Sequence, residues 1–93
     1  MGHRFEWDPR KNIVNEGKHG VSFEVATEAF DDPDRVLELD TRHMVFGEER
    51  WFCFGMVQGR VVTVRFTLRR GVIRIFGAGF WRAGRKRYED EKR

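Results

Sequence analysis

Lys18 and His19 are neighbours in the link Lys18-His19-Gly20 between two predicted helices. An amine offsets negative charge and an imidazole transfers protons near neutral pH, so the pair is suited to chemistry on a phosphate ester. Structural roles are the alternative. Lys18 would then interact favourably with a helix C terminus, and His19 would hydrogen-bond the last carbonyl groups of that helix.

The second half of the chain supplies a basic and aromatic set. Predicted strands contribute Arg65, Arg69 and Arg74, and a predicted C-terminal helix contributes Arg82, Arg85, Lys86, Arg87 and Tyr88. Basic groups neutralise phosphates, and aromatic rings stack on unpaired bases. The aromatic candidates for stacking are Phe52, Phe54, Trp81 and Tyr88. Alternatively, these aromatics form a second small core beneath a solvated basic rim.

These residue types could cleave RNA without a metal ion. Attack by the 2′-OH needs a base for its proton, a cation to offset charge on the phosphate, and an acid for the leaving 5′ oxygen. The catalytic candidates are Lys18, His19, Arg69, Arg74, Arg82 and Tyr88. The RNA-binding candidates are Arg65, Arg85, Lys86 and Arg87. We expect the guanidinium groups to converge on one pocket that holds a phosphodiester.

Charge is distributed unevenly along the 93 residues, whose net charge is +3. Residues 1–49 carry six Lys/Arg and twelve Asp/Glu, a net of −6, whereas residues 50–93 carry twelve and three, a net of +9. Such a split indicates a polyanionic partner for the second half. The alternative is that the two halves neutralise each other within one fold.

Several classes of protein are excluded by the composition. The single cysteine, Cys53, excludes a disulfide framework and is expected to be buried and inert. No metal-ligand spacing or nucleotide-binding fingerprint occurs, so neither a metal nor another cofactor is expected. No apolar run reaches about 18 residues and no signal region is present. The sequence therefore predicts a cytoplasmic protein without membrane contact.

Periodicity predicts a single α+β domain over residues 1–93. Helices are expected at about 9–16, 22–30 and 80–91, around an antiparallel sheet of about four to five strands with a β-meander at about 51–78. Short strands at 4–7 and 36–39 complete the sheet. Two-residue turns at Gln58-Gly59 and Arg70-Gly71 would place one set of residues on the core face. That set is Trp51, Cys53, Val62, Val64, Phe66, Leu68, Ile73 and Ile75.

An ordered series of motifs covers roughly residues 4–89. Its main parts are Phe5-Glu6-Trp7-Asp8-Pro9-x-Lys11-Asn12, Lys18-His19-Gly20-Val21-Ser22-Phe23, Phe30-x-Asp32-Pro33, Glu49-Arg50-Trp51, Thr67-x-Arg69 and Ile73-Arg74-Ile75. This series resembles the BrnT toxins of prokaryotic type II toxin–antitoxin modules. The resemblance implies a RelE-like fold, metal-independent mRNA cleavage and neutralisation by a BrnA-like antitoxin. It also implies that operator DNA is bound only through the antitoxin complex.

The same resemblance carries site residues over by position. Lys18 and His19 match the K-H-G-V motif, and Arg69 and Arg74 match the T-x-R and I-R-I positions. Where the family usually reads I-S-A-R-x-A, this chain has the segment 76–81 with Gly79 at the arginine position. Either Arg82 supplies the missing cation, or the chain is a weakened toxin relic that binds nucleic acid or protein without cleaving. A third alternative is an interaction protein that binds a basic tail through its acidic half.

Overall fold

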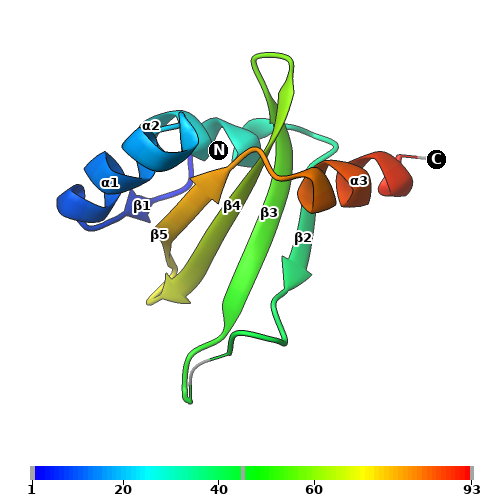
Figure 1. Cartoon of the computed structure of the whole chain (residues 1–93). Helices are drawn as coiled ribbons and strands as arrows, with labels where there is room; N and C mark the ends of the chain where they lie inside the picture. The colour runs from blue at the N-terminus through cyan, green and yellow to red at the C-terminus, as the bar shows by residue number, and fades with distance from the viewer. Residues whose placement is uncertain (1, 45, 93) are drawn as a thin grey trace.

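Five strands form one mixed sheet in the order β1-β5-β4-β3-β2 (Figure 1). The computed structural model describes residues 2–44 and 46–92. Its strands are β1 (Phe5–Glu6), β2 (Val36–Leu39), β3 (Arg50–Val57), β4 (Arg60–Arg69) and β5 (Val72–Gly79). Its helices are α1 (Pro9–His19), α2 (Phe23–Ala26), the 3-10 helix η1 (Thr27–Asp31) and α3 (Arg82–Glu91). The α+β class is confirmed.

The meander of β3, β4 and β5 is set by its two tight turns. Gln58 and Arg70 have φ angles of 51° and 53°, and each is followed by a glycine with positive φ. Two successive residues of positive φ are typical of type I′ turns, which match the twist of the strands they join. The predicted register is confirmed, with Trp51 opposite Phe66 and Leu68 opposite Ile73.

Leu68 does not belong to the core, contrary to the prediction. Its relative exposure is 55% because β4 extends there toward the Arg70–Gly71 turn, beyond the part of the sheet that the helices cover (Figure 1). Cys53 does lie in the core, fully buried. Burial raises the pKa of its thiol to about 12, which leaves it protonated and inert.

The first strand corrects the predicted sheet topology. β1 pairs in parallel with β5, with Phe5 opposite Ile73 and Glu6 opposite Arg74, so the fully antiparallel sheet was wrong. A two-residue strand carries too little alternation to indicate its direction, and its pairing is fixed by the path of the chain into α1.

Helix α1 is longer than predicted. The Asp8 carboxylate caps its start by accepting from the Arg10 N–H at 2.8 Å, and Pro9 occupies the first turn. The helix continues through Gly17 and ends at Gly20, which has a φ of 73° and donates its N–H to the Glu16 carbonyl. Lys18 and His19 therefore lie in the last helical turn and not in a connector.

The predicted second helix at 22–30 is one α-helical turn, α2, followed by the 3-10 helix η1. Ser22 caps α2 through the Val25 N–H at 3.1 Å. The chain then passes so close to β3 that a side chain at Gly55 would collide with the main chain of Ala29. This close approach accompanies the tighter winding and buries Phe30 against Phe66.

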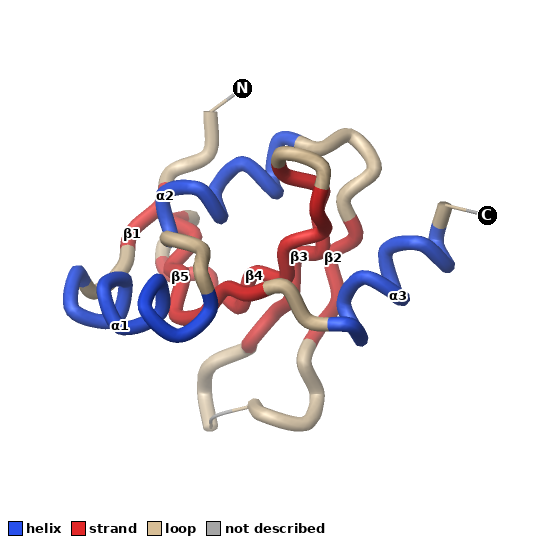
Figure 2. Tube along the Cα trace, turned by 45° about the horizontal axis from the view of Figure 1, so that its top comes forward, coloured by secondary structure: helices blue, strands red, loops and turns tan. Residues whose placement is uncertain are grey.

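The helices cover the two faces of the sheet separately. α2 and η1 pack on the main core, which includes Phe23, Val64 and Ile75. α3 crosses the other face, where its Tyr88 packs with Phe54 and Val61 (Figure 2). Gly84 permits this approach, because a Cβ there would collide with the Thr63 hydroxyl.

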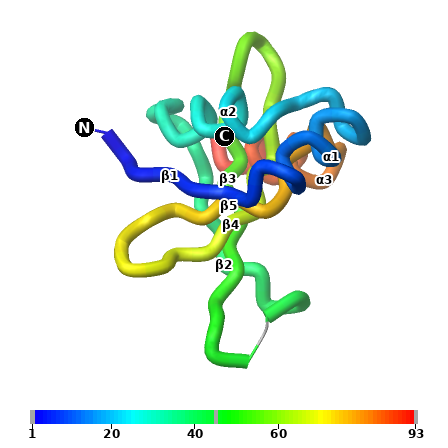
Figure 3. Tube along the Cα trace, turned by 90° about the vertical axis from the view of Figure 1, so that its left-hand side faces the viewer, coloured from blue at the N-terminus to red at the C-terminus, as the bar shows by residue number. Residues whose placement is uncertain are grey.

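The β2–β3 connection and the β3–β4 turn extend from opposite ends of the sheet (Figure 3).

Within residues 2–44 and 46–92, none of the helices has the length and hydrophobicity needed to cross a bilayer. α3 leaves uncovered the part of its sheet face that is nearer the β2–β3 connection (Figure 1).

Candidate functional site

The last turns of α1 are held on β5 by the buried side chain of Asn15. Its Nδ2 donates to the carbonyl oxygens of Val21 at 3.0 Å and Ala78 at 2.9 Å, and its Oδ1 accepts from the Ala78 N–H at 3.2 Å. Three hydrogen bonds from one amide fix the helix on the strand. Because Lys18 and His19 follow Asn15 by one turn, this contact sets where they face.

A cavity of about 350 Å³ lies between α1 and the sheet, and we call it the basic cavity. It is lined by Arg10, Lys11, Val14, Asn15, Lys18, His19, Arg65, Phe76, Gly77 and Trp81. Four of these side chains are Lys or Arg, and none of the described lining residues is Asp or Glu. Within the described chain, none of the four forms an ion pair. The cavity therefore has the positive potential that attracts a phosphate.

A β-bulge shapes the sheet side of the basic cavity. The register of β4 and β5 shifts at this point, so that Phe76 and Gly77 both lie near Arg65. The Arg65 guanidinium carbon lies 5.0 Å from the Phe76 ring centroid, and that of Arg50 lies 4.8 Å from it. Cation–π attraction to the Phe76 ring stabilises the position of each of these two guanidinium groups.

Trp81 also lines the basic cavity, and it is 39% exposed. Its ring packs edge-on against His19, with 5.0 Å between centroids. It also covers Gly79, where an added Cβ would lie only 2.7 Å from the indole. Any side chain at position 79 would therefore displace the indole from its present place.

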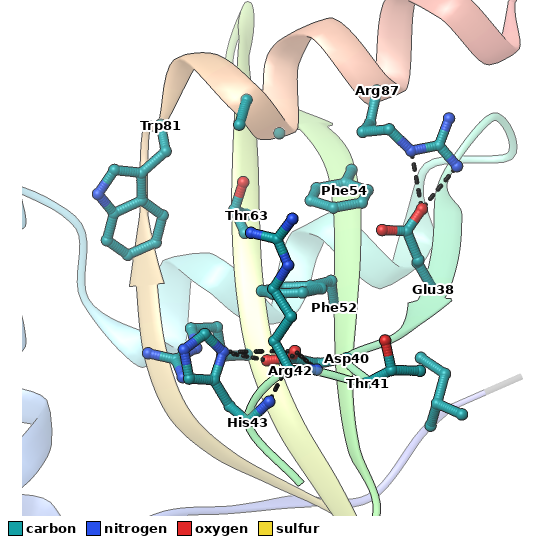
Figure 4. A pocket seen from close by; sticks show the side chains of 14 residues that line it. Glu38, Asp40, Thr41, Arg42, His43, Phe52, Phe54, Thr63, Trp81 and Arg87 are labelled. Carbon is teal, nitrogen blue, oxygen red and sulfur yellow. Dashed lines mark hydrogen bonds and ion pairs between the residues drawn. The ribbon is translucent and has the colours of Figure 1, made fainter.

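A second cavity, of about 610 Å³, lies between α3, β2 and the same sheet face, and we call it the aromatic cavity (Figure 4). Phe52 and Phe54 stack with 5.6 Å between centroids and line it. Phe54 is buried in a small cluster with Val61 and Tyr88, as the alternative of a second small core predicts, and Phe52 is partly buried against this cluster. The polar lining of this cavity includes the Asp40–His43 pair and the Arg87–Glu38 ion pair (Figure 4). Arg65 and Trp81 line both cavities, and we call these two residues the shared wall.

The structure brings only part of the predicted set together. Lys18, His19 and Arg65 line the basic cavity, and Arg87 lines the aromatic cavity. Arg69 and Arg74 line neither of them. Each forms an ion pair with a glutamate, Arg69 with Glu48 at 3.0 Å and Arg74 with Glu6 at 3.1 Å. The expected convergence of all the guanidinium groups on one pocket does not occur.

The remaining candidates belong to α3. Arg82, Arg85 and Lys86 are exposed and line neither cavity, and Lys86 forms an ion pair with Asp90 at 3.6 Å. They point into solvent because Gly84 and Tyr88 form the buried side of this helix. Their contribution to RNA binding stays a prediction.

Tyr88 is buried and its hydroxyl is committed to another residue. The side chain is 2% exposed, and its hydroxyl donates to Asp32 Oδ2 at 2.6 Å. Burial and this carboxylate raise the pKa of the phenol to about 12. The same Asp32 oxygen accepts from the Met56 N–H at 2.7 Å, so Tyr88 joins α3 to η1 and β3. This geometry does not support the predicted proton transfer by Tyr88.

Sequence reasoning missed Arg10 and Lys11 as parts of the site, along with the positioning role of Asn15. A signal was present, because Lys11, Asn15 and Lys18 recur at the spacing of one helix face. The predicted helix ended at Glu16, so Lys18 was not counted on this face. Among the described residues, no group of three or more His, Cys, Asp or Glu side chains is placed to hold a metal ion.

The comparisons with known proteins bear on this geometry. The model of one family, described as the ribonuclease toxin BrnT of type II toxin–antitoxin systems, matches residues 7–84. Among curated proteins, no significant match was found. The matched segment includes most of the fold and every residue that lines the basic cavity. A ribonuclease toxin acts on RNA and is paired with an antitoxin, and the chain belongs to this BrnT family.

Proposed function

We propose that this protein is an endoribonuclease that cleaves mRNA by 2′-OH attack without a metal ion. The basic cavity is the observation that carries the proposal. It places Arg10, Lys11, Lys18 and Arg65 around one imidazole, with no carboxylate among the described lining residues. Such a lining attracts a phosphate and repels a divalent cation, so the protein's own cations would offset the charge of the transition state.

The roles follow from the chemistry of each group. Arg65 presents a planar guanidinium for two phosphate oxygens, and Lys18 supplies a second positive charge. His19 transfers a proton, since imidazole is both an acid and a base near neutral pH. Trp81, which is 39% exposed, offers a face on which a flanking base stacks.

RNA outside the cavity would follow the open part of the sheet and the outer surface of α3. Arg69 and Arg74 lie on the first, and Arg82, Arg85 and Lys86 on the second, whereas Arg87 faces β2 at the aromatic cavity. The exposed ion pairs of Arg69 and Arg74 are weak enough to exchange their glutamates for phosphates. Arg82 is the proposed replacement for the cation that Gly79 does not supply.

The proposed partner is a BrnA-like antitoxin in the cytoplasm. Coverage of the basic cavity and the neighbouring sheet face would exclude RNA directly, and an acidic segment would complement the positive charge there. Operator DNA would be bound only by the complex, with the antitoxin providing the DNA-reading element.

Purified protein incubated with RNA in excess EDTA tests the activity. Cleavage should persist, with products ending in 2′,3′-cyclic phosphate, and a Lys18→Ala/Arg65→Ala double variant should be slower by at least about 100-fold. Arg4→Ala is the control, because Arg4 is exposed and lines neither cavity. Intact RNA at high protein excess would contradict the proposal.

Gly79 favours one alternative, a catalytically weakened relic that only binds nucleic acid or protein. The alternative rests on the missing cation, whose place is covered by the Trp81 ring. Expression in a host without the antitoxin separates the two functions. A nuclease slows growth, and the double variant relieves the effect, whereas a relic leaves growth unchanged.

A further inference from the structure

A second imidazole lies beyond the shared wall, at the rim of the aromatic cavity. His43 Nδ1 lies 3.1 Å from Asp40 Oδ2, and its side chain is 61% exposed (Figure 4). Asp40 itself is only 4% exposed. It follows β2 directly, where its N–H donates to the Arg50 carbonyl at 2.7 Å. An exposed ring is thus held by a buried carboxylate at the end of a strand.

The Asp40 carboxylate is held in its ionised form. Burial acts to raise its pKa, but hydrogen bonds from the Arg42 N–H, the His43 ring and the His43 N–H outweigh burial and lower it. The two main-chain bonds measure 3.0 and 3.2 Å. An ionised carboxylate only accepts hydrogen bonds, so His43 Nδ1 carries the proton. Nε2 is then the ring nitrogen left to bind a proton from a substrate.

The position of His43 relative to the basic cavity indicates a role for its Nε2. His19 lines the basic cavity, His43 lines the aromatic cavity, and the two cavities adjoin at Arg65 and Trp81. A phosphate bound by Arg65 would lie where the cavity lined by His19 meets the cavity lined by His43. Cleavage by 2′-OH attack needs a base and an acid on opposite sides of the phosphorus, because the attacking and leaving oxygens are in line.

We propose that His43, oriented by Asp40, is the general base of RNA cleavage and acts opposite His19 as the acid. This inference rests on the proposed ribonuclease function and extends it to a second cavity. Asp40 is a positioning residue, and its negative charge stabilises the imidazolium that forms when His43 takes up a proton.

In the proposed step, His43 Nε2 removes the 2′-OH proton while the 2′ oxygen forms a bond to phosphorus. The bond between phosphorus and the 5′ oxygen breaks, and His19 donates a proton to that leaving oxygen. The products are a 2′,3′-cyclic phosphate and a 5′-OH. One proton has moved to His43 and one has left His19, and exchange with water restores both rings.

The test compares His43→Ala, His19→Ala and the control His3→Ala on two substrates. His3 is exposed and lines neither cavity. On ordinary RNA, both cavity variants should lose at least about 100-fold in rate, whereas the control should stay within about twofold of the wild type. A substrate with sulfur in place of the leaving 5′ oxygen needs no acid. On this substrate His19→Ala should regain its rate and His43→Ala should stay slow.

The pH profile gives a second readout. A base must be neutral and an acid must be protonated to act, so the wild-type rate should pass through a maximum in the imidazole range. His43→Ala should lose the rising limb of this profile, and His19→Ala the falling limb. Asp40→Asn should lower the rate on both substrates, because the ring loses the carboxylate that orients it. The other charged groups lining this cavity are Glu38, Arg42, Arg65 and Arg87.

The outcomes separate the two proposals. If the wild type cleaves neither substrate, the ribonuclease function and the inference both fail. If the wild type cleaves and His43→Ala matches it, only the inference fails. Recovery of His43→Ala on the sulfur substrate, or an unchanged pH profile with weaker RNA binding, would also overturn the assignment of His43 as the base.

Discussion

Arg65 is the residue on which most of the proposed site chemistry depends. It lines both cavities, and its guanidinium is held near the Phe76 ring at 5.0 Å. A cation held in this way is in place before RNA arrives, so little order has to be created when the phosphate acquires charge. The neighbouring aromatic faces favour arginine over lysine, because a planar guanidinium stacks and an ammonium does not.

We expect Arg65→Ala to reduce kcat/KM for RNA cleavage by about 100-fold, because it removes a charge that stabilises the transition state. Arg65→Lys should recover only part of this loss, since it keeps the charge without the bidentate geometry. Single-turnover cleavage assays check both values, with Arg4→Ala as the control. Equal rates for Arg65→Ala and Arg4→Ala would contradict a role for Arg65 at the phosphate.

The contact between Gly79 and Trp81 makes a different prediction at the residue scale. Gly79→Ala should destabilise the fold by about 1–3 kcal/mol, because its Cβ would enter the space of the indole. In a Trp81→Ala background the same substitution should be nearly neutral. Urea unfolding of the four proteins of this cycle measures the coupling. Additive effects would show that the two residues do not compete for space.

Some of these residues could be identified from the sequence and others could not. Lys18 and His19 could be identified from the sequence by their chemistry, and the structure places both in the lining of the basic cavity. His43 did not stand out, because its importance depends on the burial of Asp40 and on a loop that returns to the sheet. The environment of a titratable side chain is a tertiary property, which local spacing does not encode.

At the scale of the elements, a partly buried hydrogen bond helps to attach α3 to the rest of the fold. The Tyr88 hydroxyl donates to Asp32, which belongs to the segment after η1. Burial acts to raise the Asp32 pKa, but hydrogen bonds, led by that from Tyr88, lower it overall. The ionised form of Asp32 and the neutral form of Tyr88 are therefore both favoured by folding.

The stability of the protein should decline at both ends of the pH scale through this pair. The depressed pKa of Asp32 contributes stability that is lost as the pH falls below about 4. The raised pKa of Tyr88 contributes stability that is lost as the pH rises from the ordinary tyrosine pKa of 10.0 toward about 12. Because the chain has one tyrosine, tyrosinate absorbance reports Tyr88 alone.

Native protein should show a tyrosinate midpoint near 12, and unfolded protein one near 10.0. Tyr88→Phe should lower the free energy of unfolding at neutral pH and remove the decline above the normal tyrosine range. Urea unfolding across the pH scale measures both effects. A native midpoint equal to that of the unfolded chain would contradict the partly buried hydrogen bond.

The elements themselves were predicted unevenly. The meander register followed from two glycine turns, because turn type and side-chain alternation constrain it twice. The end of α1 was missed, because a glycine at position 17 looks like a stop signal. Asn15 anchors the helix beyond it, and Gly20 takes the positive φ that the true end requires.

At the scale of the whole molecule, the charge split along the sequence only partly describes the surface. Among the described residues, five ion pairs join the acidic and basic halves: Arg50–Glu48, Arg69–Glu48, Arg74–Glu6, Arg87–Glu38 and Lys92–Asp34. These pairs support mutual neutralisation, the alternative noted from the sequence. Three of the four cations of the basic cavity, Arg10, Lys11 and Lys18, come from the acidic half. The fold thus concentrates positive charge where the sequence average conceals it.

The affinity for single-stranded nucleic acid should fall steeply with salt. For a non-cleavable 2′-O-methyl RNA, the slope of log K against log salt should shrink by about 0.7 for each phosphate contact removed. Lys11→Ala and Arg10→Ala should each show this reduction. Lys92→Ala should not, because Lys92 lies at the far end of α3 beside Asp34. Fluorescence anisotropy over a salt series measures the slopes, and identical slopes in all variants would contradict binding at the basic cavity.

The shared wall determines how large an inhibitor of this protein has to be. Since Arg65 and Trp81 border both cavities, an inhibitor does not have to fill either cavity. One acidic or aromatic side chain bound between Arg65 and Trp81 would occupy the place proposed for the scissile linkage. A short peptide would then suffice as an antidote, and resistance to it would arise at the same two positions that the proposed activity needs.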